Sequence, residues 1–423
     1  MNNNYEDKTL EKSIIIIDLK AFYASVECVD RNLNPFLTPL VVVDKSRGPG
    51  TIILSVTPFL KVKGISSRLR LFELPAGQYV YAKPRMKRYI EINIEIINLI
   101  LKYIGFDDIH IYSIDEFFIN ASPYLKLYNT NDIGLAKFLL DKIYTNFSLT
   151  ACAGIGPNMF LAKCALDLEA KNNKTNIARW DEKDIETKLH KIKPLSKMWS
   201  ISTHLEKRLN NLGLFSVGDI AYCPLNILQD KLGVIGEELY YLSHGIDLSD
   251  IREKYEPQNN SLTVGQTLDR DYFKSDLEVL IREMIDELCA RLRLKRQFTR
   301  VIKFYLKYSK SIKLKAIHKQ CTLDYGSDDE EIIFNACSSF IALIKDNIPI
   351  RKISISLSNL YNPTYEQLDL LESPNIQNKN KQLAITIDKI KSKYGKDAIS
   401  RLDALSTSST IKKRNKLIGG HHK

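Results

Sequence analysis

The feature that most constrains the fold is a run of four isoleucines that ends in a carboxylate. Residues 13–18 read Ser-Ile-Ile-Ile-Ile-Asp. A short, fully apolar run of this kind is typical of a central β-strand that is buried on both faces, and this strand carries Asp18 at its end. Predicted helices and further strands follow along the chain, so we expect an α+β fold with several domains.

A second pair of carboxylates lies at the centre of an alternating segment. Residues 109–119 read IHIYSIDEFFI, and this alternation predicts two strands that meet at residues 113–116. If Asp115 and Glu116 converge with Asp18, the three charges repel one another unless cations lie between them. Two Mg²⁺ ions about 3.5–4 Å apart would remove this repulsion and support a phosphoryl transfer. The spacing alone favours the alternative, in which three unrelated carboxylates lie at turns.

Positive charge is concentrated in two stretches of the chain. The 61 Lys and Arg residues exceed the 50 Asp and Glu residues, which gives a net charge of +11. Residues 291–319 hold eleven basic residues and no acidic one, and residues 376–423 hold twelve basic and three acidic residues. Cations without interleaved counter-charges favour contact with a nucleic-acid backbone, although a solvated charged face is the alternative. In residues 299–315 apolar and basic side chains alternate loosely, which predicts a strand with one basic face.

The composition excludes several classes of protein. No apolar run reaches the roughly 18–20 residues that a membrane-spanning helix needs, and residues 1–12 lack the apolar core of a secretory signal. The seven cysteines are scattered without a Cys-x-x-Cys pair, which argues against a disulfide framework and a structural zinc site. We therefore expect a cytoplasmic protein with no membrane partner.

Four segments, in sequence order, resemble motifs of the Y-family DNA polymerases, the translesion enzymes. The segment from Asp18 to Glu27 (DLKAFYASVE) resembles the first motif, and residues 113–116 (SIDE) resemble the second catalytic motif. Residues 154–156 (GIG) and the stretch from residue 161 to Lys171 resemble the palm segment that follows. The sequence is most similar to the UmuC-like ultraviolet-damage repair subgroup of Gram-positive bacteria and their phages or plasmids.

The resemblance implies a right-hand architecture with a ferredoxin-like palm, small fingers, a helical thumb and an α/β little finger. We expect an N-terminal extension at 1–12, the palm at 13–31 and 76–179, the fingers at 32–75, the thumb at 180–251, a linker at 252–260, the little finger at 261–362 and a tail at 363–423. Residues 198–220 resemble a helix-hairpin-helix of the thumb, whose backbone N–H groups bind phosphate. Ser200 and Ser202 replace its two glycines, so an ordinary helical hairpin is an equal alternative.

The resemblance also implies the residues of a polymerase active site. Asp18, Asp115 and Glu116 would bind two Mg²⁺ ions, for which Mn²⁺ could substitute, together with the backbone carbonyl of Leu19. Tyr23 matches the steric-gate position, where the ring occupies the space of a ribose 2′-OH and favours dNTPs over rNTPs; a packed core tyrosine is the alternative. The other residues that we expect at the nucleotide are Phe22, Lys61, Lys171 and, above the nascent base pair, the bulky Ile52 and Leu54.

Three positions depart from the family pattern. Pro58 stands where many members carry a triphosphate-binding tyrosine, and proline offers neither a hydroxyl nor an N–H. Lys61 replaces an arginine, so it keeps the charge but loses the bidentate fork. Asp167 and Lys171 are separated by one residue more than in the family pattern. An ion pair between these two residues is the alternative role of Lys171.

Two further segments are expected to bind partners. The basic stretch falls in the little finger, where it would bind the phosphates of primer-template DNA through Arg291, Arg293, Arg300, Lys303, Lys307, Lys310, Lys313 and Lys315. Residues 367–371 (QLDLL) resemble the peptide that bacterial polymerases insert into the sliding clamp, with contacts from Gln367, Leu368, Leu370 and Leu371. A leucine patch at a helix end is the alternative. An accessory subunit or a recombinase filament would be a further partner of this protein, which we expect to be monomeric.

Together, these features predict a template-directed DNA polymerase of low fidelity. Such a nucleotidyltransferase adds dNTPs to a primer 3′-OH by two-metal phosphoryl transfer, and it would bypass damaged template bases in DNA repair of the SOS type. One alternative is a catalytically silent accessory of the same fold that binds DNA and the clamp. A nucleotidyl cyclase-type palm enzyme is another, but it would not need the basic stretch or the clamp peptide.

Overall fold

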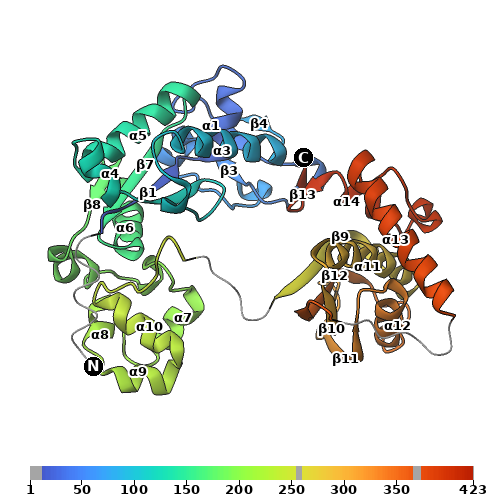
Figure 1. Cartoon of the computed structure of the whole chain (residues 1–423). Helices are drawn as coiled ribbons and strands as arrows, with labels where there is room; N and C mark the ends of the chain where they lie inside the picture. Colours follow the sequence, from blue (N-terminus) through green and yellow to red (C-terminus); the bar gives the residue numbers. More distant parts are fainter. Residues whose placement is uncertain (1–11, 254–259, 365–372, 423) are drawn as a thin grey trace. The chain divides into compact units, whose positions relative to one another are not determined.

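The structure is a computed structural model of the chain, and it describes residues 12–253, 260–364 and 373–422 (Figure 1). The expected clamp-binding segment 367–371 lies outside the described residues, so clamp binding stays a prediction. No described helix combines the length and the apolar character that crossing a lipid bilayer requires.

The first of two compact units, Met1–Lys254, contains a five-stranded sheet in the order β5-β6-β1-β7-β8. The isoleucine run forms the central strand β1 (Ile14–Leu19), and all six of its residues are buried, as expected for a strand covered on both faces. It pairs antiparallel with β6 on one side and with β7 on the other. The remaining strands are β5 (Ile109–Ile111), β6 (Glu116–Asn120), β7 (Ala151–Gly156) and β8 (Ile177–Arg179).

Helices cover both faces of this sheet. The long helices α3 (Met86–Ile100) and α5 (Asp132–Phe147) lie on one face, and α6 (Met159–Ala165) lies on the other (Figure 1). Gly154 and Gly156 of β7 make the close approach of α6 feasible. A Cβ atom on Gly154 would lie 2.1 Å from the carbonyl oxygen of Ala162, and one on Gly156 would lie 2.6 Å from the nitrogen of the same residue. The Gly-Ile-Gly segment therefore brings α6 against the strand beside β1.

A small sheet and a group of helices complete the first unit. The small sheet has the order β3-β2-β4, and β4 lies beyond residue 75, where we expected the fingers to end. The strands of this sheet are β2 (Leu40–Val42), β3 (Ser55–Val56) and β4 (Val80–Ala82). The helices are α1 (Phe22–Val29), α2 (Pro58–Val62), α4 (Ser122–Leu127), α7 (Thr203–Asn210), α8 (Val217–Ala221), α9 (Leu225–Leu232) and α10 (Val234–Ser243).

The two serines of the expected helix-hairpin-helix both act at the start of α7. Ser200 has a φ of 77°, a left-handed conformation that glycine adopts more readily than other residues. Ser202 is the N-cap of α7, and its hydroxyl accepts a hydrogen bond from the backbone N–H of Leu205 at 3.2 Å. The chain therefore keeps a glycine-like turn at the first position and uses a serine cap at the second.

The second unit, Tyr255–Lys423, contains a four-stranded antiparallel sheet in the order β11-β10-β12-β9. Exposed basic residues of β10 alternate with buried apolar ones, so this strand has the basic face that the sequence predicts. Apolar residues of the strands and of two helices form one core. These elements are β9 (Ser261–Tyr272), β10 (Phe298–Tyr308), β11 (Ile317–Ser327), β12 (Ile350–Tyr361), α11 (Leu277–Lys295) and α12 (Glu330–Ile341).

The basic C-terminal segment packs on the same unit. It contains α13 (Pro374–Tyr394) and the short helix α14 (Ile411–Arg414), and several of its cations pair with carboxylates of the sheet and of the two helices that cover it. The pairs are Lys391–Asp286 at 2.6 Å, Arg401–Glu330 at 2.5 Å, Lys413–Asp269 at 2.5 Å and Arg414–Glu287. Part of the positive charge of this segment is thus matched within the unit, so it is less free for DNA than the sequence alone indicates.

The same segment supplies hydrogen bonds to a buried carboxylate. Glu283 lies in the middle of α11 and is 7% exposed. Its oxygens accept hydrogen bonds from the Ser409 hydroxyl and from the backbone N–H and hydroxyl of Thr410, the last two at 3.1 Å. A buried carboxylate that loses its partners is strongly destabilising, so the C-terminal segment belongs to the folded core of this unit.

Deletion of residues 373–423 should therefore destabilise α11, because Glu283 loses these donors. Removing one partner of a buried charge costs about 3–5 kcal/mol. Hydrogen–deuterium exchange of the full-length and truncated proteins measures this: peptides of α11 should lose protection, and peptides of β1 provide the control. Glu283→Leu in the truncated protein should recover part of the protection, and unchanged exchange in α11 would contradict the assignment.

Candidate active site

Asp18 and Glu116 lie opposite each other on neighbouring strands. They are register partners between β1 and β6. Side chains alternate between the two faces of a strand, so Asp18 shares a face with Ile14 and Ile16, which belong to the apolar cluster that includes α6. The carboxylates therefore point to the side of the sheet where α6 packs.

A third carboxylate, Asp167, completes an acidic cluster. Side-chain oxygens of Asp18, Glu116 and Asp167 lie within 4.8 Å of one another, and oxygen donors of this kind suit a hard divalent cation. From the sequence, Asp167 was expected only as a possible ion-pair partner of Lys171. The signal for its position was the four-residue spacing of Lys163, Asp167 and Lys171, because this spacing places side chains on one face of a helix.

The structure does not bring the side chain of Asp115 into this cluster, although we expected it there. Its carboxylate accepts a hydrogen bond from the Ser113 hydroxyl at 2.7 Å, while its backbone carbonyl accepts one from the N–H of Leu19 at 2.9 Å. Burial, followed by the charge of Asp115, raises the pKa of Tyr23, so Asp115 lies close enough to Tyr23 for its charge to act on the hydroxyl. Metal binding by Asp115 and by the Leu19 carbonyl stays a prediction.

Two lysines offset most of the negative charge of the acidic cluster. The ammonium of Lys163, a residue only 5% exposed, lies 2.8 and 2.9 Å from the two oxygens of Glu116. The ammonium of Lys171 lies 2.6 Å from Asp18 and 2.7 Å from Asp167. Burial would lower the pKa of Lys171, but the charges of Asp18 and Asp167 outweigh burial and raise it. Lys171 therefore makes the ion pair with Asp167 that was the alternative to its expected role, and it also contacts Asp18.

A π-helical turn accommodates the extra residue before Lys171. Residues Leu166–Ala170 form this turn directly after α6, and the N–H of Lys171 donates to the carbonyl of Leu166 at 3.1 Å. A hydrogen bond that spans five residues admits one residue more than an α-helical turn, and such turns are frequent at functional sites. The helix direction is thus preserved, and the ammonium of Lys171 still reaches Asp18.

The steric-gate candidate lies at the start of α1, directly after the strand that carries Asp18. The chain turns from β1 into α1 at Ala21, which has a left-handed φ of 47°. Phe22 is buried and Tyr23 is half-buried. Tyr23 and Leu54 are both partly buried and pack against the same apolar core cluster.

Of the remaining predicted nucleotide residues, Ile52 precedes β3 and forms an isolated β-bridge with Arg70, and Lys61 lies on α2. Ile52 is 43% exposed. Desolvation lowers the pKa of Lys61, with Asp18 opposing this effect and Lys171 adding to it, which places the Lys61 ammonium in the field of the acidic cluster. Pro58 is the first residue of α2, where the missing N–H has no helical partner in any case.

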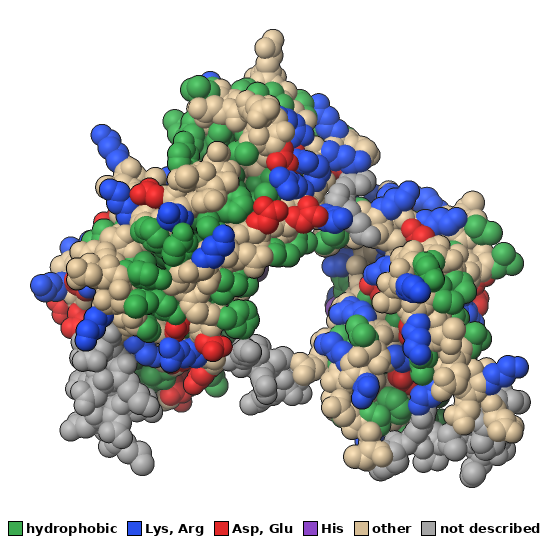
Figure 2. All heavy atoms as spheres, turned by 45° about the horizontal axis from the view of Figure 1, so that its top comes forward, with side chains coloured by type: hydrophobic (Ala, Val, Ile, Leu, Met, Phe, Trp, Pro, Cys, Tyr) green, Lys and Arg blue, Asp and Glu red, His purple; other side chains and the backbone are tan. Residues whose placement is uncertain are grey.

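The predicted DNA-binding residues divide into three groups. Arg300, Lys303 and Lys307 are exposed on β10, and Lys310, Lys313 and Lys315 are exposed in the turn between β10 and β11. Arg291 lies on α11 and donates to the carbonyl of Thr263 at 3.3 Å. Figure 2 shows basic side chains spread over the visible face of the second unit.

Arg293 does not belong with these residues. Its side chain is 10% exposed and pairs with Asp388 at 2.6 Å and Glu330 at 3.2 Å. A guanidinium held by two carboxylates on the helical side of the unit has a structural role. Both partners lie far from Arg293 in the sequence, and DNA contact by Arg293 stays a prediction.

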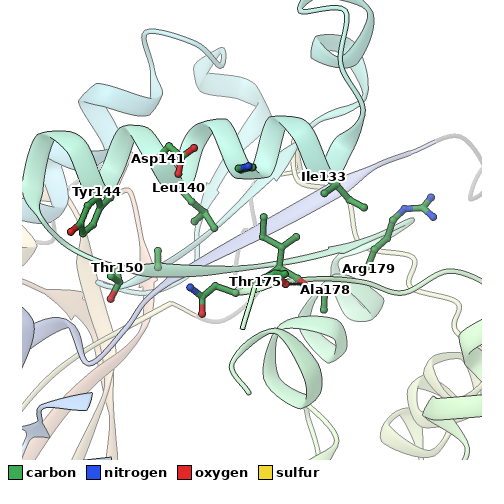
Figure 3. Close-up of a pocket in the computed structure, with 12 residues that line it drawn as sticks. Ile133, Leu140, Asp141, Tyr144, Thr150, Thr175, Ala178 and Arg179 are labelled. Atoms are coloured by element: carbon green, nitrogen blue, oxygen red, sulfur yellow. Dashed lines mark hydrogen bonds between the residues drawn. The ribbon is translucent and has the colours of Figure 1, made fainter. Parts of the chain in front are cut away.

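A cavity in the first unit lies away from the acidic cluster. It has a volume of about 600 Å³ and lies between α5 and β8, with Ile133, Leu140 and Tyr144 on the helix side (Figure 3). None of the predicted site residues lines it. We therefore assign the functional site from its charged groups and not from the position of this cavity.

Comparisons with known proteins agree with this geometry. Two family models match the chain, the impB/mucB/samB family at residues 17–167 and its C-terminal domain at residues 259–370. The protein described as UV-damage repair protein UvrX of Bacillus subtilis (strain 168) is 35% identical over 413 residues, which are 97% of both chains. DNA polymerase IV 2 of the same organism is 29% identical over 419 residues, 98% of this chain and 99% of the relative.

A solved structure shares the fold. A Y-family DNA polymerase chimera of Dbh and Dpo4 aligns with a TM-score of 0.65 and 20% identity, covering 83% of this chain and all of that structure. The sheet, the acidic cluster and the family matches together define a DNA polymerase. The chain belongs to the impB/mucB/samB family, the Y family of DNA polymerases. The expected fold class and family are confirmed.

Proton binding by the cluster should compete with cation binding. Burial, followed by the adjacent Glu116, raises the pKa of Asp18 to about 7. Burial would also raise the pKa of Glu116, but the hydrogen bond with Asp18 and the Lys163 ammonium lower it. Below about pH 7 a cation must therefore displace the proton of Asp18, because only the ionised carboxylate is a good ligand.

We expect the affinity for a divalent cation to fall as the pH drops from 8 to 6, by up to about tenfold per pH unit below the pKa of Asp18. Calorimetric titration with Mn²⁺ at both pH values measures the affinity, and repeating it in buffers with different heats of ionisation counts the protons released. An affinity that does not change with pH would contradict the raised pKa.

Proposed function

We propose that this polymerase extends primers with low fidelity across damaged template bases, by two-metal phosphoryl transfer. The observation that carries the proposal is the meeting of Asp18 and Glu116 at the end of two paired strands in a Y-family polymerase. The relative described as a UV-damage repair protein supports a role in DNA repair, which we assign to the SOS-type response. DNA as substrate implies that the enzyme works in the cytoplasm.

The oxygen-only donor set of the cluster fits Mg²⁺. Asp18 and Glu116, with Asp115 and the Leu19 carbonyl, would hold two ions. Such ions stabilise the attacking and leaving oxygens of a nucleotidyl transfer. All of these ligand atoms are oxygens, which also suit Mn²⁺, so Mn²⁺ could replace Mg²⁺.

Lys171 is suited to bind the triphosphate of the incoming dNTP. Its ammonium contacts both Asp18 and Asp167, so it can leave Asp18 for a phosphate oxygen and keep Asp167 as a partner. Lys61 would add a second cation to the same side of the site. Tyr23 would exclude the 2′-OH of an rNTP, and Ile52 and Leu54 would contact the nascent base pair.

Primer extension with dNTPs and Mg²⁺ tests the proposed chemistry. Glu116→Gln keeps the shape of the side chain but removes its charge, and we expect kcat to fall at least about a hundredfold, the usual loss when one electrostatic contact to the reacting groups is removed. Asp107→Asn is the matched control, because Asp107 is an exposed carboxylate in a turn outside the cluster. Equal rates for the two variants, or no extension by the wild type, would favour a silent accessory.

We propose that the second unit binds duplex phosphates through the open face of its sheet. Lys303 and Lys307 are exposed on β10, where the buried residues between them face the core of this unit. Lys310 extends this basic surface into the adjoining turn. Arg300, Lys313 and Lys315 are assigned to the same surface, which should carry little sequence readout because phosphate contacts do not depend on the bases. Arg291 lies on α11, so its DNA contact is proposed separately from this face of the sheet.

Replacing Lys303, Lys307 and Lys310 by Gln should weaken binding to every DNA sequence, and it should reduce the slope of log K against log salt by about 3, since each lost phosphate contact removes about one unit. The matched control replaces three exposed lysines of the C-terminal segment, Lys379, Lys389 and Lys396, which changes the net charge equally. Fluorescence anisotropy at several salt concentrations measures both slopes. Equal slopes for the two triple variants would contradict the assigned surface.

The sliding clamp, an accessory subunit and a recombinase filament stay predicted partners. The peptide expected to bind the clamp lies outside the described residues, and a monomeric state is likewise an expectation from the sequence.

A further inference from the structure

The ring of Tyr23 rests on a second, fully buried tyrosine. Tyr89 of α3 stacks on Tyr23 with ring centroids 4.5 Å apart and an interplanar angle of 17°. Phe22 approaches Tyr89 edge-on at 6.3 Å. Tyr89 is 0% exposed, whereas Tyr23 is half-buried. The buried ring therefore forms a floor under the more exposed one.

A buried carboxylate fixes the far end of Tyr89. The Tyr89 hydroxyl donates to Oε1 of Glu27 at 2.7 Å, and Glu27 is 0% exposed. Burial, followed by the charge of Glu27, raises the pKa of Tyr89, so its hydroxyl remains a donor. Glu27 lies four residues after Tyr23 on α1, and the two tyrosines are thus connected both through the ring stack and through this helix.

Two arginines hold Glu27 in turn. Arg85 donates from Nε to Glu27 Oε1 at 2.9 Å and also contacts Asp30 at 2.6 Å. Arg31 forms an ion pair with the other oxygen of Glu27. Charged hydrogen bonds of this kind are short and directional. Together they fix where the Tyr89 hydroxyl, and hence the Tyr89 ring, can lie.

This arrangement does more than fill space. A phenylalanine at position 89 would fill nearly the same volume without a buried charge, and burying Glu27 carries a desolvation penalty. A steric gate works by position, because a ring that retreats by about 1 Å leaves room for part of a hydroxyl, and displacements of that size change rates strongly. Because Tyr89 is held by Glu27 at its hydroxyl and contacted by Phe22 at its ring, it prevents such a displacement of Tyr23.

We propose that Tyr89, held by Glu27, is a positioning residue for sugar selection: it keeps the Tyr23 ring where a ribose 2′-OH would lie. The inference rests on the proposed function, since it requires that Tyr23 faces the sugar of an incoming nucleotide. It assigns to α3 a part in substrate choice, although α3 contributes no residue to the acidic cluster.

Single-nucleotide primer extension tests the inference through the ratio of kcat/KM for a dNTP to that for the matching rNTP. Tyr89→Leu removes the stack, and we expect this ratio to fall about tenfold, mainly because rNTP incorporation rises. Tyr89→Phe keeps the stack and removes the hydrogen bond to Glu27, so we expect a smaller fall of about threefold. A purely structural role would lower both incorporation rates together and leave the ratio unchanged.

Tyr124→Phe is the matched control. The Tyr124 hydroxyl also donates to a carboxylate, that of Asp108, at 2.9 Å, but Tyr124 belongs to α4 and has no ring contact with Tyr23 or Tyr89 among the described residues. The ratio of kcat/KM for a dNTP to that for the matching rNTP should be the same in Tyr124→Phe as in the wild type. Thermal unfolding of each variant separates loss of selection from loss of fold, and Tyr89→Phe decides the question if Tyr89→Leu does not fold.

Tyr23→Ala separates the inference from the function on which it rests. A wild type that incorporates no dNTP overturns the proposed function, and an unchanged ratio in Tyr23→Ala overturns the gate and the inference with it. If Tyr23→Ala loses selection while folded Tyr89→Phe and Tyr89→Leu keep the wild-type ratio, the inference alone is overturned. If Tyr89→Phe has no further effect in a Tyr23→Ala background, Tyr89 acts through Tyr23, and an additive effect would overturn that link.

Discussion

The fold of the first unit has to compensate the repulsion between carboxylates that its five-stranded sheet places side by side. Pairing of β1 with β6 puts Asp18 opposite Glu116, and Asp167 approaches both from the other layer. Such a group is stable only with compensating positive charge. In this structure the ammonium groups of Lys163 and Lys171 supply that charge. The same requirement makes the site fit for divalent cations and for the phosphates that accompany them.

The backbone features around the site serve this charge balance. Two glycines let α6 pack closely against β7, which brings Lys163 within reach of Glu116. The π turn admits an extra residue and still directs Lys171 to Asp18. Glu27 and Tyr89 hold the ring that we assign to sugar selection. Charge and shape are thus fixed by separate groups of residues.

Much of the site could be predicted because its residues lie in short motifs. The isoleucine run, the alternation around residues 113–116 and the order of the motifs were sufficient for the central strand, the hairpin and the family. Asp167 was not recognised as part of the cluster, since the sequence shows that it shares a helix face with two lysines but not which strand that face meets. The ion pair of Arg293 was not foreseen for a related reason: its partner Asp388 is remote in the sequence, and only the packing of α13 brings the two together.

The sequence by itself determined the fold class, the family and the strand that carries Asp18, because local apolar periodicity and short motifs depend on neighbouring residues alone. The tertiary structure decided which charges meet. It paired Lys171 with two carboxylates, turned the Asp115 side chain to Ser113, matched part of the cationic C-terminal segment to acidic residues of its own unit and stacked Tyr89 under Tyr23. These contacts join residues from separate elements. Their geometry depends on long-range packing, which local sequence patterns do not predict.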